Sequence, residues 1–430
     1  MRRLTRLLPA IALFGITYVL MLTLTQYRPY IALASGLIFI ATGMLPLDQI
    51  IPSIDFNVLL MIAGTMGLVS LFIESKMPSL LADLIMEKVP NVQMAAVALA
   101  VFAGVISAFV DNVATVLMVA PVALAICRNL GTNPVPFIIG IAVSSNLQGA
   151  ATLVGDTTAI MLGSYADMSF MDFFWYKGRP SIFFAVELGA VLSALILAWL
   201  FRKEKAPIER RGQRTVVSDY VPTVLLCGTI VMLICASFLP VKPDITNGMI
   251  CCSMMLVGLV YNYILRREII AIKGPLKDID FETIGLLVGL FLMIGGITAE
   301  GVIDAVVAVL AEVGGDNIFV LYTVIVWGSV LVSAFIDNIP YVATMLPVIS
   351  GLAASIGIDP TVLFFGLLSG ATLGGNCTPV GASANIAGIG ILRKSGYEVK
   401  NSDFMRIGIP FTFAAIVPAY IYIWLLYGGM

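Results

Sequence analysis

Long apolar runs dominate the pattern of hydrophobic and polar positions along this chain. Such runs lie near 7–25, 30–47, 57–74, 181–201, 219–239, 246–264, 281–299 and 407–427. Most approach the roughly 20 residues that a helix needs to cross the hydrocarbon core of a bilayer. The pattern therefore predicts an all-α polytopic membrane protein.

Four further stretches carry at most one charge each but do not fit a single straight helix. They are 92–127, 134–165, 318–358 and 360–392, between 32 and 41 residues long, with Gly, Pro, Asn, Asp or Thr clustered near the middle. Non-helical backbone at membrane depth is tolerated only inside the protein or along a wet cavity. We therefore expect two re-entrant hairpins, at about 92–127 and 318–358, and two broken helices, at about 134–165 and 360–392.

The chain also repeats itself. The segment Ser107-Ala-Phe-Val-Asp-Asn112 returns as Ser333-Ala-Phe-Ile-Asp-Asn338, an offset of 333 − 107 = 226. Thr152-Leu-Val-Gly155 returns as Thr378-Pro-Val-Gly381 at the same offset. The repeat predicts a first half at 1–201, a linker at 202–218 and a second half at 219–430.

Each half contains the same series: three spans, an amphipathic piece (77–89 or 301–313), a hairpin, a broken span and a last span. If each hairpin returns to its own side, each half has about five crossings, so the second half is inverted relative to the first. Inverted repeats with broken helices are typical of secondary transporters. A cytoplasmic linker 202–218 places most Lys and Arg inside, Arg28 included, as the positive-inside rule requires. It leaves Arg2, Arg3 and Arg6 outside, in conflict with that rule.

Composition narrows the classes of function. Of 430 residues, 60% are apolar and only 12% are charged, and histidine is absent. Without histidine, a His-based triad or a HExxH zinc site cannot form. With no nucleophile motif either, we expect a transporter rather than an intramembrane hydrolase or another enzyme, with no organic cofactor. The net charge of −2 and the lack of a basic block give no indication of a nucleic-acid partner.

Three carboxylates lie inside the hairpins and broken helices: Asp111, Asp156 and Asp337. Charges at membrane depth are costly, so they are candidates for function. Asp111 and Asp337 are repeat mates. With the adjacent amides and nearby hydroxyls they could form two oxygen-rich Na⁺ sites, because hard cations prefer oxygen ligands. The residues concerned are Asp111, Asn112, Thr115, Asp337, Asn338 and Thr344. The alternative is that both aspartates only cap the helices that follow, and the two roles are compatible.

The breaks of the two interrupted helices offer further ligands. Their polar residues are Asn146, Gln148, Thr152, Thr372, Asn376 and Thr378. These residues could complete an ion or substrate site, or they could belong to a close helix-packing surface. The position that corresponds to Asp156 in the second half is Ala382, so this carboxylate has no acidic mate. It is a candidate proton carrier, because burial disfavours its charged form. The alternative is that it caps the helix that follows. Ser383 and Asn385 are the polar counterparts in the second half.

Two runs carry a family resemblance. Ser333-Ala-Phe-Ile-Asp-Asn-Ile-Pro-Tyr-Val-Ala-Thr-Met-Leu-Pro347 resembles the ion transporter superfamily, in the branch of arsenite-pump membrane subunits, sodium–proton antiporters and P-protein-like permeases. Gly374-Gly-Asn-Cys-Thr-Pro-Val-Gly-Ala-Ser-Ala-Asn385, followed by Ser395-Gly-Tyr397, is similar to the P-protein-like members. Citrate and divalent anion:sodium symporters are related to this branch.

The resemblance implies a scaffold and a transport domain, an elevator-type motion, often a homodimer, and Na⁺ or H⁺ as coupling ion. Dicarboxylate carriers of the superfamily have Ser-Asn-Thr at the hairpin tips, where this chain has Asp111-Asn-Val and Asp337-Asn-Ile. The extra negative charge disfavours dicarboxylate binding and favours a cation or an uncharged solute.

The prediction is thus a secondary transporter of a small ion or anion in the cytoplasmic (inner) membrane, in contact with lipid. Three alternatives remain open: a Na⁺/H⁺ antiporter, an arsenite or antimonite exporter and a passive ion channel. A partner ATPase, known for arsenite pumps, leaves no trace in such a sequence.

Overall fold

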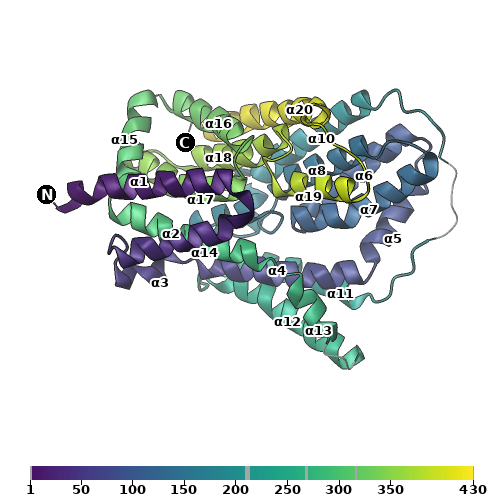
Figure 1. Ribbon diagram of the computed structural model, residues 1–430, viewed down its shortest axis with the longest axis horizontal. Helices are drawn as coiled ribbons and strands as arrows, with labels where there is room; N and C mark the ends of the chain where they lie inside the picture. Colours follow the sequence, from purple (N-terminus) through teal and green to yellow (C-terminus); the bar gives the residue numbers. More distant parts are fainter. Residues whose placement is uncertain (1, 209–213, 267–269, 315–316, 430) are drawn as a thin grey trace.

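The computed structural model describes residues 2–208, 214–266, 270–314 and 317–429. Within them the chain is almost entirely helical, and most helices run along the long axis of the molecule (Figure 1). Seven helices of the described residues are long and apolar enough to span a membrane: α1, α4, α10, α12, α14, α17 and α20. The all-α polytopic fold predicted from the hydropathy pattern is therefore confirmed.

The first half contains ten helices within the described residues. They are α1 (Arg2–Thr23), α2 (Arg28–Ala41), α3 (Ile50–Ser53), α4 (Phe56–Glu74), α5 (Met77–Met86), α6 (Val92–Ser107), α7 (Asn112–Leu130), α8 (Val135–Gly149), α9 (Thr157–Tyr165) and α10 (Ile182–Leu200). Short 3₁₀ turns lie at η1 (Thr25–Tyr27), η2 (Leu47–Gln49) and η3 (Met171–Phe173), and β1 (Trp175–Tyr176) pairs antiparallel with β2 (Arg179–Pro180).

The second half follows the same order. Its helices are α11 (Val221–Ser237), α12 (Thr246–Arg266), α13 (Ile270–Lys277), α14 (Phe281–Ala299), α15 (Val302–Gly314), α16 (Ile318–Ser333), α17 (Asn338–Ile356), α18 (Thr361–Gly374), α19 (Ser383–Lys394) and α20 (Asn401–Tyr427), with a 3₁₀ turn at η4 (Gly375–Cys377). The amphipathic helices α5 and α15 lie steeply across the other helices, at opposite ends of the molecule (Figure 1). One predicted span ends early: α2 stops at Ala41 rather than near 47, because Gly43 turns the chain at a φ of +69°.

Equivalent helices of the two halves begin on equivalent polar caps. A buried helix start leaves backbone N–H groups without partners, and a side-chain oxygen satisfies them. Asp55 and Asp280 accept from Val58 N and Thr283 N, both at 3.0 Å, at the starts of α4 and α14. The remaining matched caps are Asn91 and Asn317 on α6 and α16, and Asp111 and Asp337 on α7 and α17.

Helices of one half pack against helices of the other. Helix α2 of the first half packs on α14 of the second, and their repeat-related counterparts, α12 and α4, pack on each other in the same way. Glycine permits both approaches: a Cβ on Gly289 would clash with the backbone of Ala32, and one on Gly64 with the backbone of Cys251. These glycines are 289 − 64 = 225 residues apart. The inversion of the halves and the boundaries of the repeats remain predictions, which this packing supports.

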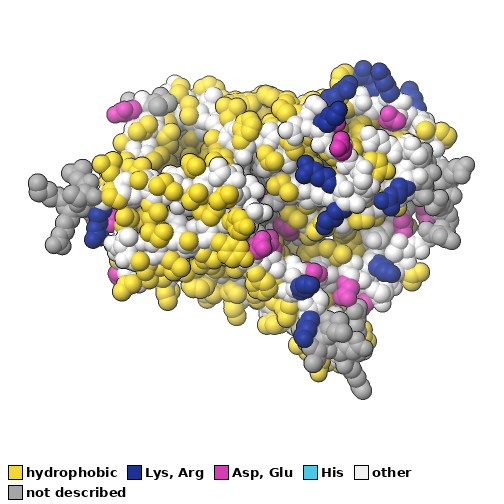
Figure 2. Space-filling view, in the orientation of Figure 1, with side chains coloured by type: hydrophobic (Ala, Val, Ile, Leu, Met, Phe, Trp, Pro, Cys, Tyr) yellow, Lys and Arg dark blue, Asp and Glu magenta, His cyan; other side chains and the backbone are white. Residues whose placement is uncertain are grey.

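The linker between the halves packs against α5 and the start of α6. The Arg214 guanidinium donates to both carboxylate oxygens of Glu87, at 2.6 and 2.8 Å, and lowers the pKa of that carboxyl group. Thr215 donates to Asp83 through its backbone N at 2.8 Å and its hydroxyl at 2.6 Å. On the face shown in Figure 2, Lys and Arg gather toward the end of the molecule that carries α5 and α13. This bias agrees with a cytoplasmic linker, whose sidedness remains a prediction.

Candidate functional site

The two helix–turn–helix units α6–α7 and α16–α17 bring their turns to the breaks of the two interrupted helices. Asp111 caps α7 by accepting from the backbone N of Val113 and Ala114, both at 3.0 Å. Asp337 caps α17 by accepting from Ile339 N at 3.1 Å. The capping role expected for both aspartates is therefore confirmed, and it leaves one oxygen of each carboxylate for other partners.

Asp156 lies where the two tips meet and is only 4% exposed. Asn112 Nδ2 donates to its Oδ1 and Asn338 Nδ2 to its Oδ2, both at 3.4 Å, and Thr158 Oγ1 donates to Oδ2 at 2.8 Å. One carboxylate thus accepts a hydrogen bond from an amide group of each hairpin turn. No Lys or Arg among the described residues forms an ion pair with it. A buried carboxylate surrounded only by neutral donors calls for a proton or a bound cation.

A second set of amides joins the two broken helices. Asn146 Nδ2, on α8, donates to Thr372 O at 2.7 Å and to Asn376 Oδ1 at 3.1 Å. Asn376 Nδ2 donates back to Val143 O at 2.9 Å, and the hydroxyls of Thr158 and Thr372 are 3.1 Å apart. The network replaces backbone bonds that the breaks remove, and Asn112 Nδ2, 3.1 Å from Asn146 Oδ1, connects it to the Asp156 cluster.

Thr152 and Thr378 occupy matched positions that differ from the sequence-based expectation. Thr152 Oγ1 donates to Ala108 O at the first hairpin turn, and Thr378 Oγ1 donates to Ala334 O at the second. Each threonine therefore supports the end of a hairpin's first helix, where carbonyls have no helical partner. These contacts favour a structural role, in which each hydroxyl stabilises a hairpin turn, over the ligand role predicted from the sequence.

Two glycines bring the breaks against the hairpin turns. A Cβ on Gly155 would lie 2.6 Å from Gly149 O and 2.8 Å from Ser107 O. A Cβ on Gly381 would lie 2.6 Å from both Gly375 O and Ser333 O. Only glycine fits so close to backbone on several sides, and the same fit recurs in both halves. The repeated Thr-x-x-Gly segments thus encode the docking of each broken helix on its hairpin.

The remaining predicted residues lie around this centre with separate partners. Thr344 Oγ1 donates to Pro340 O at 3.0 Å and contacts the Tyr18 hydroxyl. Asn385 Nδ2 donates to the carbonyls of Gly375 and Thr378, at 3.0 and 3.1 Å. Gln148 packs over Gly104, where a Cβ would lie 2.8 Å from its Cδ. Three buried oxygens of the predicted site residues, Thr115 Oγ1, Gln148 Oε1 and Asn385 Oδ1, have no hydrogen-bond partner within the described residues.

Ser383 and Arg28 meet at the second tip. Ser383 Oγ donates to Asp337 Oδ2 at 3.0 Å, and Arg28 Nη1 approaches the same oxygen at 3.3 Å. Arg28, predicted from the sequence to lie among the cytoplasmic Lys and Arg, therefore forms an ion pair with the hairpin, and its side of the membrane remains a prediction. Its side chain is 14% exposed, because it reaches from the start of α2 to the hairpin.

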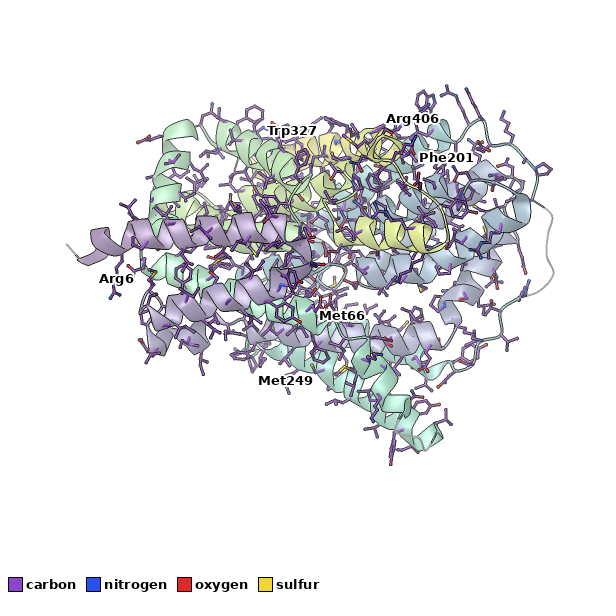
Figure 3. All side chains as sticks on the ribbon, viewed as in Figure 1. Arg6, Met66, Phe201, Met249, Trp327 and Arg406 are labelled. Atoms are coloured by element: carbon purple, nitrogen blue, oxygen red, sulfur yellow. The ribbon has the colours of Figure 1, made fainter. Side chains whose placement is uncertain are left out.

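A cavity of about 450 Å³ opens beside Asp156. Its wall on α4 includes Met66, which Figure 3 labels near the middle of the molecule. Its described lining residues include four carboxylates and no Lys or Arg: Asp111, Asp156, Asp278 and Asp280. Asp278 accepts from Ser70 Oγ at 2.5 Å. Asp278 and Asp280 were missed from the sequence because they precede a span rather than interrupt one.

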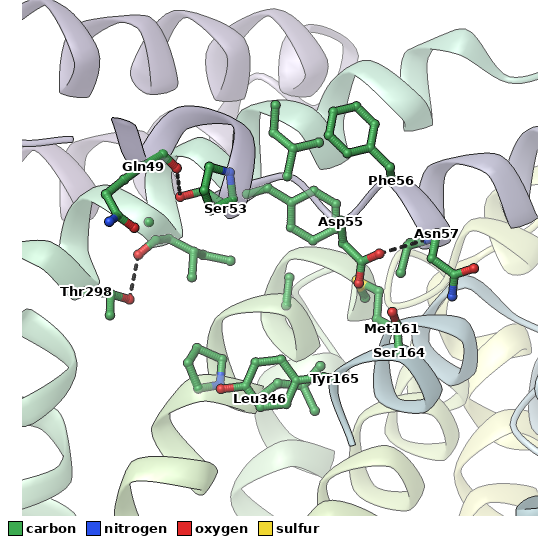
Figure 4. Close-up of a pocket in the computed structure, with 18 of the residues that line it drawn as sticks. Gln49, Ser53, Asp55, Phe56, Asn57, Met161, Ser164, Tyr165, Thr298 and Leu346 are labelled. Atoms are coloured by element: carbon green, nitrogen blue, oxygen red, sulfur yellow. Dashed lines mark hydrogen bonds between the residues drawn. The ribbon is translucent and has the colours of Figure 1, made fainter. Parts of the chain in front are cut away.

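A larger cavity of about 970 Å³, shown in Figure 4, is the repeat-related counterpart of the first. Its wall on α14 contains Phe291, Ile294, Gly295 and Thr298, and the residues 225 positions earlier, Met66, Val69, Ser70 and Ile73, line the first cavity. Asp55, Asn57 and Met161 border it on one side, and Tyr165 and Leu346 lie at its lower edge in Figure 4. The two cavities are thus equivalent in position, but Asp156 lines only the smaller one.

Comparison with known proteins identifies the family of this chain. Residues 18–370 match the family described as citrate transporter. The chain belongs to the citrate transporter family. It is 31% identical to an uncharacterised transporter of Mycobacterium tuberculosis, over 97% of this chain and 98% of that relative. It is also 27% identical to the human P protein, over 85% of this chain and 52% of the P protein.

A solved structure shares the fold. The YdaH transporter of Alcanivorax borkumensis superimposes with a TM-score of 0.62 at 13% identity, covering 91% of this chain and 89% of that one. The predicted membership of the ion transporter superfamily is confirmed by the family match and these relatives. This citrate transporter family member is a multi-pass membrane transporter.

Proposed function

We propose that this protein is a secondary active transporter of the cytoplasmic membrane in which Asp156 carries the coupling cation, alternately Na⁺ and a proton. The supporting observation is the environment of Asp156: a buried carboxylate that receives neutral amides from both hairpin turns and no Lys or Arg among the described residues. Its charge is compensated within the protein only when a cation or proton is bound.

The ligand chemistry suits a monovalent cation. Carboxylate, amide and hydroxyl oxygens are hard donors of the kind that Na⁺ and other hard cations prefer. Within the described residues no group of three or more Cys, Asp or Glu side chains is placed to hold a metal ion together. Asp156 therefore offers one negative charge to one positive charge, which is the balance needed for competition between Na⁺ and H⁺.

The charge of the cavity lining determines which ions the cavity attracts. Four carboxylates, and no Lys or Arg among its described lining residues, concentrate cations and repel anions. A free polycarboxylate such as citrate, after which the family is described, would meet this repulsion. We therefore favour Na⁺/H⁺ exchange over citrate uptake. Elevator motion and a homodimer, both implied by the family resemblance, are part of the same proposal.

The experiment is Na⁺-driven proton movement in proteoliposomes that hold a pH-sensitive dye. Na⁺ alone should change the internal pH, and Asp156→Asn should abolish the change. Asp304→Asn, an exposed carboxylate on α15, is the matched control and should behave as wild type. Silence with Na⁺ alone, followed by a response when citrate, phosphate or arsenite is added, would replace exchange by coupled transport of that solute.

A further inference from the structure

The two hairpin tips have matching backbones but different charge environments. At the first tip, Asp111 Oδ1 takes both cap bonds, and its other oxygen receives no donor from the described residues. At the second tip, Asp337 Oδ1 takes the cap bond while Oδ2 accepts from Ser383 at 3.0 Å and from Arg28 at 3.3 Å. A positive charge is therefore already present at one tip.

Arg28 is held in place for this contact. Its Nε donates to Met21 O at 3.1 Å, across the corner between α1 and α2. Arg28 is also the first residue of α2, at the positive end of the helix dipole, where a cation is disfavoured. The nearby carboxylate of Asp337, whose side chain is 7% exposed, offsets that cost.

A second contact attaches the same corner to the same hairpin. The hydroxyl of Tyr18, a residue of α1, donates to Pro340 O at 2.7 Å and contacts Thr344 Oγ1. The α1–α2 corner thus contacts the first turns of α17 at two points. The guanidinium is fixed relative to Asp337 rather than being a free surface charge.

The packing of α2 on α14 and of α12 on α4 shows which residue of α12 corresponds to Arg28 of α2. Gly289 packs on Ala32, and its mate Gly64 packs on Cys251, so Ala32 and Cys251 are equivalent. Arg28 lies 32 − 28 = 4 residues before Ala32. The residue four positions before Cys251, at 251 − 4 = 247, is Asn247, which is buried and neutral. The first tip consequently has no counterpart of Arg28.

We propose that Arg28 is a built-in cation that occupies, at the second tip, the place left open to a coupling cation at the first. Asp337 is then neutralised permanently, and of the two pseudo-symmetric cation sites predicted from the sequence only the one beside Asp111 and Asp156 binds an ion. Arg28 is a specificity-determining residue that sets the number of cations per transport cycle. This inference rests on the proposed cation coupling and concerns its stoichiometry.

The test is the number of Na⁺ ions bound per chain, measured with ²²Na⁺ on purified protein at pH 8. Arg28→Gln should bind one Na⁺ more than wild type, because Asp337 then lacks a cation. Arg28→Lys should keep the wild-type number. Arg28→Gln combined with Asp337→Asn should return to it, and this charge-balanced variant also shows that the fold survives. Size-exclusion profiles identify any variant that fails to fold.

The outcomes separate this inference from the proposed function. An equal Na⁺ count in wild type and folded Arg28→Gln overturns the role of Arg28, whatever the wild-type count is. A wild-type count that falls on Asp337→Asn alone also overturns it, since Asp337 would then bind an ion beside Arg28. A wild-type count of zero contradicts the proposed function, Na⁺ binding at Asp156, whereas an unchanged non-zero count in folded Arg28→Gln contradicts only the role of Arg28.

Discussion

Asn112 and Asn338, which are 338 − 112 = 226 residues apart, donate to opposite oxygens of one carboxylate, that of Asp156, at 3.4 Å each. Two symmetric hairpin turns therefore share an acceptor that belongs to only one half of the chain. The repeat-related position in the other half is Ala382. The symmetric scaffold thus holds an asymmetric centre, and the chemistry follows the asymmetry.

Asp156→Asn should abolish cation-dependent transport while leaving the protein folded. The neutral amide keeps the shape of the side chain and removes a buried charge that is costly when no cation is bound. Its nitrogen, however, cannot accept the hydrogen bond that one of the two hairpin amides donates to the carboxylate, and this loss opposes the gain in stability. Thermal unfolding in detergent and Na⁺-driven proton flux are measured on the same preparation. A clear fall in melting temperature, with flux preserved in the folded fraction, would show that Asp156 serves structure rather than transport.

Thr152→Val and Thr378→Val should each lower stability by about 1 kcal/mol, the usual net contribution of one hydrogen bond, and by similar amounts. The hydroxyls brace matched hairpin carbonyls, so Na⁺ affinity should change little. Thr→Ser variants, which keep the hydroxyl, are the controls. A drop in Na⁺ affinity with unchanged stability would restore the ligand role predicted from the sequence.

Gly155→Ala and Gly381→Ala should each destabilise the protein by about 1–3 kcal/mol, the range expected for overpacking. The added methyl would lie 2.6 Å from backbone oxygen in both cases, and backbone at a docked hairpin cannot move away cheaply. Gly328→Ala on α16 is the matched control, since nothing lies within 4 Å of its Cβ position. Unfolding curves that do not distinguish the three variants would contradict the proposed docking of breaks on hairpins.

Asp278→Asn should weaken apparent Na⁺ affinity roughly two- to fivefold, because a charge across a partly hydrated cavity contributes about 1 kcal/mol or less. The amide can still accept from Ser70, so packing is retained. The loss should shrink as an inert salt is added, since salt screens such long-range effects. An unchanged affinity at low ionic strength would exclude this carboxylate from the path of the cation.

Much of the fold could be predicted from the sequence because it depends on local patterns. Apolar runs and central polar clusters predict the spans, and the Asp-Asn pairs mark both hairpin turns. Contacts between the halves could not be predicted in this way. Arg28 reads as a loop charge until α2 is seen to begin beside Asp337, and Asp278 becomes relevant only because α13 and α14 bring it to the cavity.

The central claim is that one carboxylate, Asp156, binds Na⁺ and H⁺ in competition. The most direct test adds Na⁺ to purified protein in weakly buffered solution and records the protons released together with the Na⁺ bound. The account predicts about one proton released for each Na⁺ bound at a pH where Asp156 is protonated, and neither binding nor release in Asp156→Asn. Na⁺ binding without proton release, or proton release that persists in Asp156→Asn, would contradict it.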